Sequence, residues 1–361
     1  MNKNLLDCIT MGLMGIGYMV RGFKTVGFKT GKAFKTMAFM AVASLFAPAA
    51  LAYNAGSFSV TLDNDAMVGT DRSYTNGIFI EFNSAENLAL AADTPPLVRY
   101  VSTFLPLSSN RPQGWRLRLG HQTWTPEKLN AVKPLPQERP YAGLLFVELG
   151  IYQYTGLRAD TYSFRLGAVG PNSLAEEGQK RVHRILGAQY PAGWEFQISS
   201  QTVFNLGYQG HRLISRRNAG LHNQYDLSGV GRINIGNYRS EAALAFVGRW
   251  GSRLEGSFGG VGFTPGKFFN VSALAASPSG YFLFAGIESR YRFNDITVEG
   301  DRPDEVADTR IAHLQATAIA GVVYYQQTGG ISFSLSSGSR EFKEDKHAFN
   351  ATGSIEIFMR L

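Results

Sequence analysis

Hydrophobic and polar residues alternate along most of the chain after residue 56. In residues 57–63, SFSVTLD, apolar and polar side chains take turns, with the period of two that is typical of a half-buried strand. Similar segments, mostly 8–14 residues long, recur and are often punctuated by Gly, Asn or Ser. The twelve predicted strands are residues 57–63, 75–83, 114–121, 143–152, 160–169, 196–207, 222–235, 240–250, 281–293, 311–325, 330–338 and 350–361. This pattern predicts an all-β protein with antiparallel strands.

Charged side chains inside these segments distinguish two kinds of all-β fold. They are Arg116, Arg118, Glu148, Arg165, Arg232, Glu241, Arg249, Glu288 and Arg290. A soluble β-sandwich would bury many of them at a cost in free energy, whereas the water-facing lumen of a transmembrane barrel holds them freely. Tyr152, Tyr154, Tyr281 and Tyr291 lie near strand ends, where interface belts occur. We therefore expect a transmembrane antiparallel β-barrel of about twelve strands, with the sandwich as the alternative.

Two helices are expected in the connections between strands. Ser173 and Glu176 have capping-box spacing and open a predicted helix over residues 174–188. A helix of that length in a loop between strands is usually functional. Residues 84–113 form an unusually long connection, in which Leu97 to Leu105 suggest a second short helix.

The N-terminal region indicates export. Residues 37–47 form an apolar run that follows Lys32 and Lys35 and precedes the small-x-small sequence Ala50-Leu51-Ala52. We interpret residues 1–52 as a signal peptide with an atypical N-terminal extension, cleaved after Ala52, and residues 53–361 as the barrel domain. The single cysteine, Cys8, lies in the extension, so neither a disulfide framework nor a cysteine zinc site is expected.

Composition excludes two further classes. Aromatic residues make up 12% of the 361 residues and charged residues only 17%, which argues against intrinsic disorder. Most of the net charge of +7 lies within residues 1–52. The remainder is too weakly basic for a nucleic-acid-binding surface.

Strand counting predicts which connections share a side of the membrane. If the N-terminus starts inside, the connections 64–74, 123–142 and 170–195 all face the exterior. They contain most of the clustered Asn, Asp, Thr, Gln and His residues. A passive barrel does not need such a cluster on one rim, so we infer an active site at the outer membrane surface.

Three runs of residues in these connections resemble a known family. They are Asn64-Asp65 with Thr70-Asp71-Arg72-Ser73-Tyr74-Thr75-Asn76-Gly77; Glu138-Arg139-Pro140-Tyr141-Ala142-Gly143; and Gly170-Pro171 with Gln179-Lys180-Arg181-Val182-His183-Arg184. Together they resemble the outer-membrane lipid A 3′-O-deacylases of the LpxR type, over essentially the whole mature chain. The resemblance implies a twelve-stranded barrel in the outer membrane of a Gram-negative bacterium. It also implies a calcium-dependent enzyme that removes the 3′-linked acyloxyacyl chain from the lipid A of lipopolysaccharide.

The resemblance also implies the site residues: Asn64, Asp65, Thr75, Gln179 and His183. Basic residues of the second exterior loop belong to the family site, and Lys128 or Lys133 are the candidates here. Where a related enzyme has an acidic residue shortly after the histidine, this chain has Gln189. That departure affects one metal-binding or orienting contact.

Residue types support ester hydrolysis by an activated water. The chain has no G-x-S-x-G sequence. His183 is suited to act as general base, and Gln179, four residues earlier on the same helical face, could orient it or hold substrate. Asp65, Asn64 and Thr75 offer the oxygen ligands that Ca²⁺ prefers, and the cation would polarise the ester carbonyl. Strand alternation places Asp65 and Thr75 on the lumen-facing side of their strands and Asn64 on the opposite side.

Structural roles compete with several of these assignments. Thr75 could belong to a turn with Asn76-Gly77, and His183 could be a solvated helix residue. Asp71-Arg72 is interpreted as a loop pair, and residues 138–141 as a rigid scaffold under the site. His121 ends a predicted strand on the same rim and is a further candidate.

Two other functions stay open at this point. One is a different outer-membrane lipid esterase, such as a phospholipase, although no histidine here has a serine two residues later. The other is a non-enzymatic, porin-like barrel.

Overall fold

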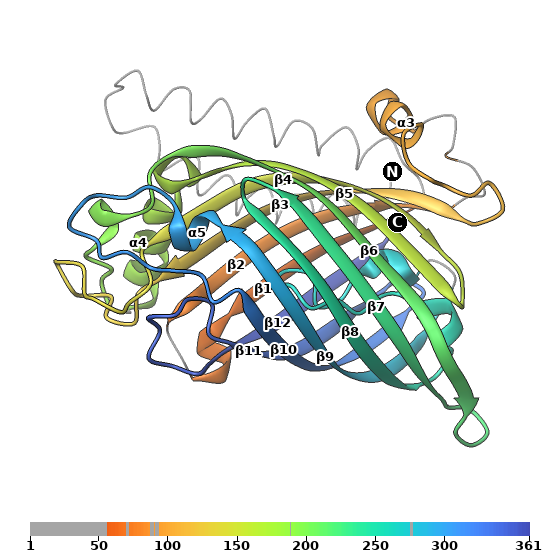
Figure 1. The fold of residues 1–361 in the computed structure, drawn as a ribbon. Helices are drawn as coiled ribbons and strands as arrows, with labels where there is room; N and C mark the ends of the chain where they lie inside the picture. Colours follow the sequence, from red (N-terminus) through yellow and green to blue (C-terminus); the bar gives the residue numbers. More distant parts are fainter. Residues whose placement is uncertain (1–55, 70–71, 87–89, 91–93, 188, 275–276) are drawn as a thin grey trace. The chain divides into compact units, whose positions relative to one another are not determined.

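Twelve antiparallel strands close into a barrel in the computed structural model (Figure 1). Each strand pairs with its neighbours in sequence, and β1 pairs with β12 to complete the ring. The strands are β1 Gly56–Asn64, β2 Ser73–Ser84, β3 Gln113–Thr125, β4 Ala142–Tyr154, β5 Arg158–Val169, β6 Gln201–Asn218, β7 Gln224–Gly236, β8 Arg239–Gly251, β9 Gly280–Asp295, β10 Leu314–Gln326, β11 Gly329–Ser339 and β12 Phe349–Arg360. The predicted barrel and its strand number are confirmed.

The structure describes residues 56–361, apart from 70–71, 87–89, 91–93, 188 and 275–276. The predicted signal peptide, its cleavage site and Asp71 lie outside the described residues. Of the twelve predicted strands, β6 differs most, because it begins at Gln201 and continues to Asn218 instead of covering 196–207. Residues 198 and 199 instead bond through their backbone N–H groups to the carbonyls of Tyr141 and Asp301.

Side chains alternate across the barrel wall as the sequence pattern predicts. On β8, Leu244 is 74% exposed on the outer side, whereas Glu241 is buried on the inner side. Glu241, Arg232 and Glu288 form ion pairs inside the barrel. The lumen therefore holds the strand charges, and the outer surface is apolar, as a lipid environment requires.

The predicted tyrosine belt is only half correct. Tyr281 and Tyr291 are exposed on the outer side. Tyr152 and Tyr154 instead point inward, where their hydroxyl groups contact the carbonyl of Ser84 and the hydroxyl of Ser272. The reason is parity, because both residues lie an even number of positions from the lumen-facing Glu148.

Within the described residues, three α-helices lie in the connections: α3 Pro96–Ser102, α4 Ala175–Leu186 and α5 Ile296–Glu299. The first two confirm the predicted helices. The predicted capping box does not form, because Leu174 is the N-cap residue of α4 and adopts the left-handed conformation at φ 62°. Ser173 instead donates to the carbonyl of Gly170. None of the helices in the described residues is long and apolar enough to cross a membrane.

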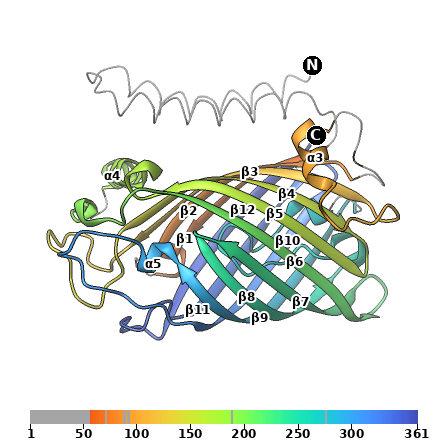
Figure 2. The same ribbon diagram turned by 45° about the horizontal axis from the view of Figure 1, so that its top comes forward.

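The connections divide between two ends of the barrel. The end with α4 and α5 also carries the 3₁₀ turn η1, Asp65–Val68, and the β3–β4 connection (Figures 1 and 2). The opposite end carries α3 and the β6–β7 turn. We call them the α4 end and the α3 end. The three connections that sequence analysis assigns to one rim therefore lie at one end.

One long connection folds back into the lumen. Residues 252–279 join β8 to β9 and include the turns η4, Leu254–Ser257, and η5, Val271–Leu274. Their apolar side chains pack on inward-facing residues of the wall, with Phe263 and Phe269 in one cluster with Phe282. We call the described residues of 252–279, which leave out 275–276, the luminal segment. It fills part of the barrel interior.

Candidate functional site

Helix α4 is held at the rim by an aromatic cluster. Ala175 of α4 packs with Leu129, Tyr141 and Trp194, all fully or nearly fully buried. The rings of Tyr141 and Trp194 are 4.8 Å apart between centroids, and the Tyr141 hydroxyl donates to the carbonyl of Leu129. The β3–β4 connection, residues 126–141, therefore supports one face of α4.

The start of α4 lies directly against the outer side of the barrel wall. A ring nitrogen of His121 on β3 lies 3.1 Å from the carbonyl oxygen of Ser173. On β4, a side chain at Gly143 would collide with Ser173 and Ala175. His121 thus contacts the turn before α4, and Gly143 provides the space that this close approach needs.

We expect Gly143→Ala to displace α4 while leaving the barrel folded. The added methyl group would push Ser173 and Ala175 outward and carry the α4 side chains with them. A displacement of about 1 Å at a catalytic group lowers the rate on the order of 10²-fold. The matched control is Gly248→Ala on β8, where a Cβ meets no atom closer than 4.0 Å. Equal activity of the two variants, measured on membranes containing substrate, would contradict a role for the α4 position.

Gln179 combines a fixed oxygen with a free donor. Its side chain is buried, and its Oε1 accepts a hydrogen bond of 2.8 Å from the indole Nε1 of Trp194. Because indole only donates, this contact fixes the amide orientation. The amide Nε2 is buried and has no hydrogen-bond partner among the described residues. A buried donor without a partner is rare and indicates a place for a ligand atom.

His183 lies one turn further along α4 and is half-buried. Its Nδ1 lies 2.5 Å from the backbone carbonyl oxygen of Gln189. A carbonyl only accepts, so Nδ1 carries the proton, and in the neutral ring Nε2 has the free lone pair. The backbone of Gln189 therefore orients the imidazole, and this contact does not require an acidic side chain at position 189.

Asn64 and Asp65 lie where β1 passes into η1. The Asn64 side chain caps the turn and accepts a 2.7 Å hydrogen bond from the backbone of Ala66. Asp65 is buried, and its Oδ2 accepts a 2.6 Å bond from the backbone N–H of Arg72. Through Arg72, Asp65 connects to Glu127 and Asn350 of neighbouring connections.

Thr75 occupies a β-bulge between Tyr74 and Asn76. Its hydroxyl lies 2.6 Å from that of Thr125 on β3. Strand alternation predicted that Thr75 faces the lumen, but that prediction assumed a regular strand without a bulge. Tyr74 reaches the inward side, where its hydroxyl donates to the carboxylate of Asp63. An inserted residue shifts the alternation by one, and strand parity alone could not reveal it.

The predicted residues therefore form two groups at the α4 end. Asn64 is the register partner of Asn76 beside Thr75, so Asn64, Asp65 and Thr75 lie together at the ends of β1 and β2. Gln179 and His183 lie on α4, which packs on β3 and β4. The Thr75–Thr125 contact joins β2 to β3, the strand that also carries His121.

The oxygen-bearing group fits a hard cation in its donor chemistry. Carboxylate, amide and hydroxyl oxygens are ligands that Ca²⁺ takes, and Asn64, Asp65 and Thr75 supply one of each. Among the described residues, no group of three or more His, Cys, Asp or Glu side chains is placed to hold a metal. Counting only the described residues of this group, a cation here would have a single protein carboxylate, which predicts weak binding completed by water and substrate.

The run Glu138-Arg139-Pro140-Tyr141 serves as scaffold in the structure. Glu138 accepts a hydrogen bond from the backbone of Lys128. Arg139 is buried and forms an ion pair with Glu341, not with Glu138. Lys128 and Lys133 are exposed in the β3–β4 connection. Trp194, Thr125 and the luminal segment were not assigned roles by sequence reasoning.

One family model and several solved structures match this chain. The family model described as outer membrane protein LpxR matches residues 36–361. A solved structure of LpxR from Salmonella typhimurium superimposes with a TM-score of 0.71 at 17% identity, covering 84% of this chain and 99% of that one. The β domain of the Bordetella autotransporter BrkA gives a TM-score of 0.41 at 10% identity, covering 85% and 98%. No curated protein matches the sequence significantly. The family match covers most of the chain, which therefore belongs to the LpxR family of outer membrane proteins.

Proposed function

We propose that this protein is a lipid A 3′-O-deacylase, which hydrolyses the 3′-linked acyloxyacyl ester of lipid A at the outer membrane surface. Membership of the LpxR family supports the substrate class. The observation that carries the proposal is the pairing on α4 of an imidazole with a free Nε2 and, one turn earlier, a buried amide donor without a partner.

His183 acts as the general base in this proposal. Its Nε2 removes a proton from water, and the resulting hydroxide attacks the ester carbonyl carbon. When the tetrahedral intermediate collapses, the bond between the former carbonyl carbon and the 3′ oxygen of the sugar breaks. The imidazolium then returns the proton to that leaving 3′ oxygen. The products are the acyloxyacyl acid and a free 3′ hydroxyl. The Gln189 carbonyl stabilises the protonated ring throughout.

Gln179 supplies a hydrogen bond to the oxygen that gains negative charge. Its Nε2–H is held in place by the Trp194 contact on the other end of the amide. A fixed donor aimed at developing charge stabilises the transition state without reorganising. Asn64, Asp65 and Thr75 would hold Ca²⁺, which when bound polarises the ester carbonyl as a Lewis acid.

The luminal segment argues against the porin alternative. Gly266 of this segment lies inside the barrel. Its backbone N–H donates to the carboxylate of Asp63 over 2.5 Å, and its carbonyl oxygen accepts from Arg118 over 2.6 Å. The luminal segment occupies part of the interior through which a porin would have to conduct. A phospholipase with a serine nucleophile has no support either, because Arg184 and Ile185 follow His183.

Mass spectrometry of lipid A tests the proposal. Expression in a host with a 3′-acyloxyacyl lipid A should remove the mass of that group. Chelation of Ca²⁺ in isolated membranes should stop the reaction, and added Ca²⁺ should restore it, because one carboxylate among the described residues of the proposed site predicts weak binding of the cation. Unchanged lipid A in a competent host would refute the deacylase, whereas activity that resists chelation would refute only the metal.

A further inference from the structure

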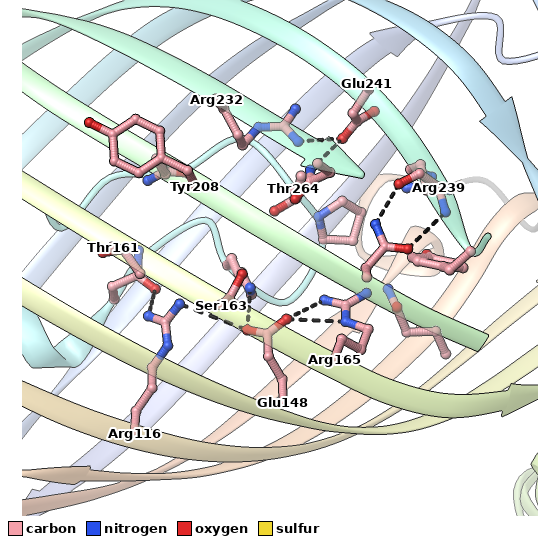
Figure 3. Close-up of a pocket in the computed structure, with 18 residues that line it drawn as sticks. Arg116, Glu148, Thr161, Ser163, Arg165, Tyr208, Arg232, Arg239, Glu241 and Thr264 are labelled. Atoms are coloured by element: carbon pink, nitrogen blue, oxygen red, sulfur yellow. Dashed lines mark hydrogen bonds and ion pairs between the residues drawn. The ribbon is translucent and has the colours of Figure 1, made fainter. Parts of the chain in front are cut away.

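A polar cavity of about 70 Å³ lies inside the barrel (Figure 3), and none of its lining residues belongs to α4. Strands β3 to β8 and the luminal segment line it together. Its charged lining residues are Arg116, Glu148, Arg165, Arg232, Arg239, Glu241 and Lys267. Five of these seven side chains are cationic. The cavity therefore presents an excess of positive charge within the protein.

The first ion-pair cluster at this cavity is short of negative charge. Glu148 is shared by Arg116, Arg165 and Lys267. The other carboxylate, Glu81, pairs with Arg118 at 2.6 Å and approaches Arg116 only to 4.0 Å. Four cations thus share two carboxylates. Arg116 is 2% exposed, and its Nε has no hydrogen-bond partner within the part of the chain that the structure describes.

The second cluster, on the other side of the cavity, has a smaller excess. Its cations are Arg139, Arg232, Arg239, Arg290 and Arg292, and its carboxylates are Glu241, Glu288, Asp295 and Glu341. Figure 3 shows Arg232 and Glu241 facing the cavity across from Glu148 and Arg165. The cavity lies between two groups that each have more cations than anions.

Buried charge without a counterion is strongly unfavourable. Burial, together with the nearby guanidinium groups of Arg116 and Arg165, lowers the pKa of Lys267 well below its usual range. Asp63 and Glu356 carry further carboxyl groups near Arg118, but neither lines the cavity. An anion bound in the cavity would favour the charged form of Lys267 and would supply negative charge that the lining residues lack.

We propose that the cavity is a binding site for a small inorganic anion, held between Lys267, Arg116 and Arg165 on one side and Arg232 on the other. Hydroxyl and amide groups complete the lining; they include Thr161, Ser163, Thr264 and Asn270. Several strong donors around a cavity large enough for a few waters suit an oxyanion such as phosphate. Because Thr264, Lys267 and Asn270 belong to the luminal segment, the bound anion ties that segment to the wall. This site is independent of the proposed deacylase activity.

Anion titration of the purified barrel tests the site. The protein is exchanged into a gluconate buffer, and inorganic phosphate is added in a calorimeter, with chloride in a parallel series. We expect saturable binding of one anion per chain. Lys267→Met should weaken it at least about tenfold, whereas Lys267→Arg should retain it. The control is Lys346→Met, because Lys346 pairs with Glu127 at the α4 end instead of lining the cavity.

Bromide gives a measurement that does not depend on any variant folding. Crystals of the unaltered protein grown in bromide should show an anomalous peak between Lys267 and Arg232. Preference for phosphate over chloride would identify an oxyanion site, and equal affinity would identify a halide-type counterion site. The proposal is overturned if neither anion binds saturably and the cavity holds only water, or if Lys267→Met binds phosphate as tightly as the unaltered chain.

Discussion

Replacing His183 by alanine is expected to remove nearly all deacylation while leaving the barrel intact. His183 is half-buried on α4, and within the described residues its ring is hydrogen-bonded to the backbone carbonyl of Gln189 alone. Its loss should therefore cost little folding free energy. General-base catalysis contributes about 10²–10⁴-fold to the rate. Lipid A from cells that express the variant should therefore keep its 3′-acyloxyacyl group by mass spectrometry.

His222→Ala is the matched control for this experiment. His222 is exposed in the β6–β7 turn at the α3 end, so its loss should leave activity unchanged. Folding of both variants is checked by the difference in gel migration between heated and unheated samples. Full activity of His183→Ala would eliminate this residue as the base. His121 on β3, which contacts the turn before α4, would then be the next candidate.

Glu148→Gln is expected to produce the largest loss of stability. Glu148 is 2% exposed and is the carboxylate shared by Arg116, Arg165 and Lys267. Neutralising it leaves three buried cations facing one another. Removing one partner of a buried ion pair costs about 3–5 kcal/mol. Urea unfolding of the protein in lipid vesicles should show a decrease in the free energy of unfolding of that order.

Glu176→Gln provides the comparison. Glu176 pairs with Lys180 one turn away on the surface of α4, and exposed pairs of this kind contribute about 0.3–0.5 kcal/mol. Equal stabilities of the two variants would show that the luminal charges are solvated freely instead of being held in the ion-pair clusters.

The barrel itself could be predicted from the sequence because alternation is a local signal. Each strand carries its own period of two, and a charge on the polar face, such as Glu148 or Arg232, is enough to identify a lumen. The same parity already places Tyr152 and Tyr154 inside, and the predicted belt was wrong for these two because it used only their nearness to strand ends.

Other features depend on contacts between distant residues and carry no local signal. The bulge at Thr75 is visible only once β2 is paired with β3. The left-handed conformation of Leu174 replaces the predicted capping box because the turn before α4 is held by β3 and β4. The orienting contact from Gln189 to His183 uses a backbone carbonyl, which any residue type could supply. The family resemblance supplied the candidate site residues, but not the contacts that hold them in place.

The luminal segment also has a mechanical meaning. At the α3 end it is fastened by bonds such as those from Arg360 to the carbonyls of Leu274 and Pro278. Its other extremity, at Gly266, is bonded to Asp63, the residue that precedes Asn64. The segment therefore connects the two mouths of the barrel through the lumen. Because the segment is hydrogen-bonded near both mouths, we expect a displacement at one mouth to be felt at the other.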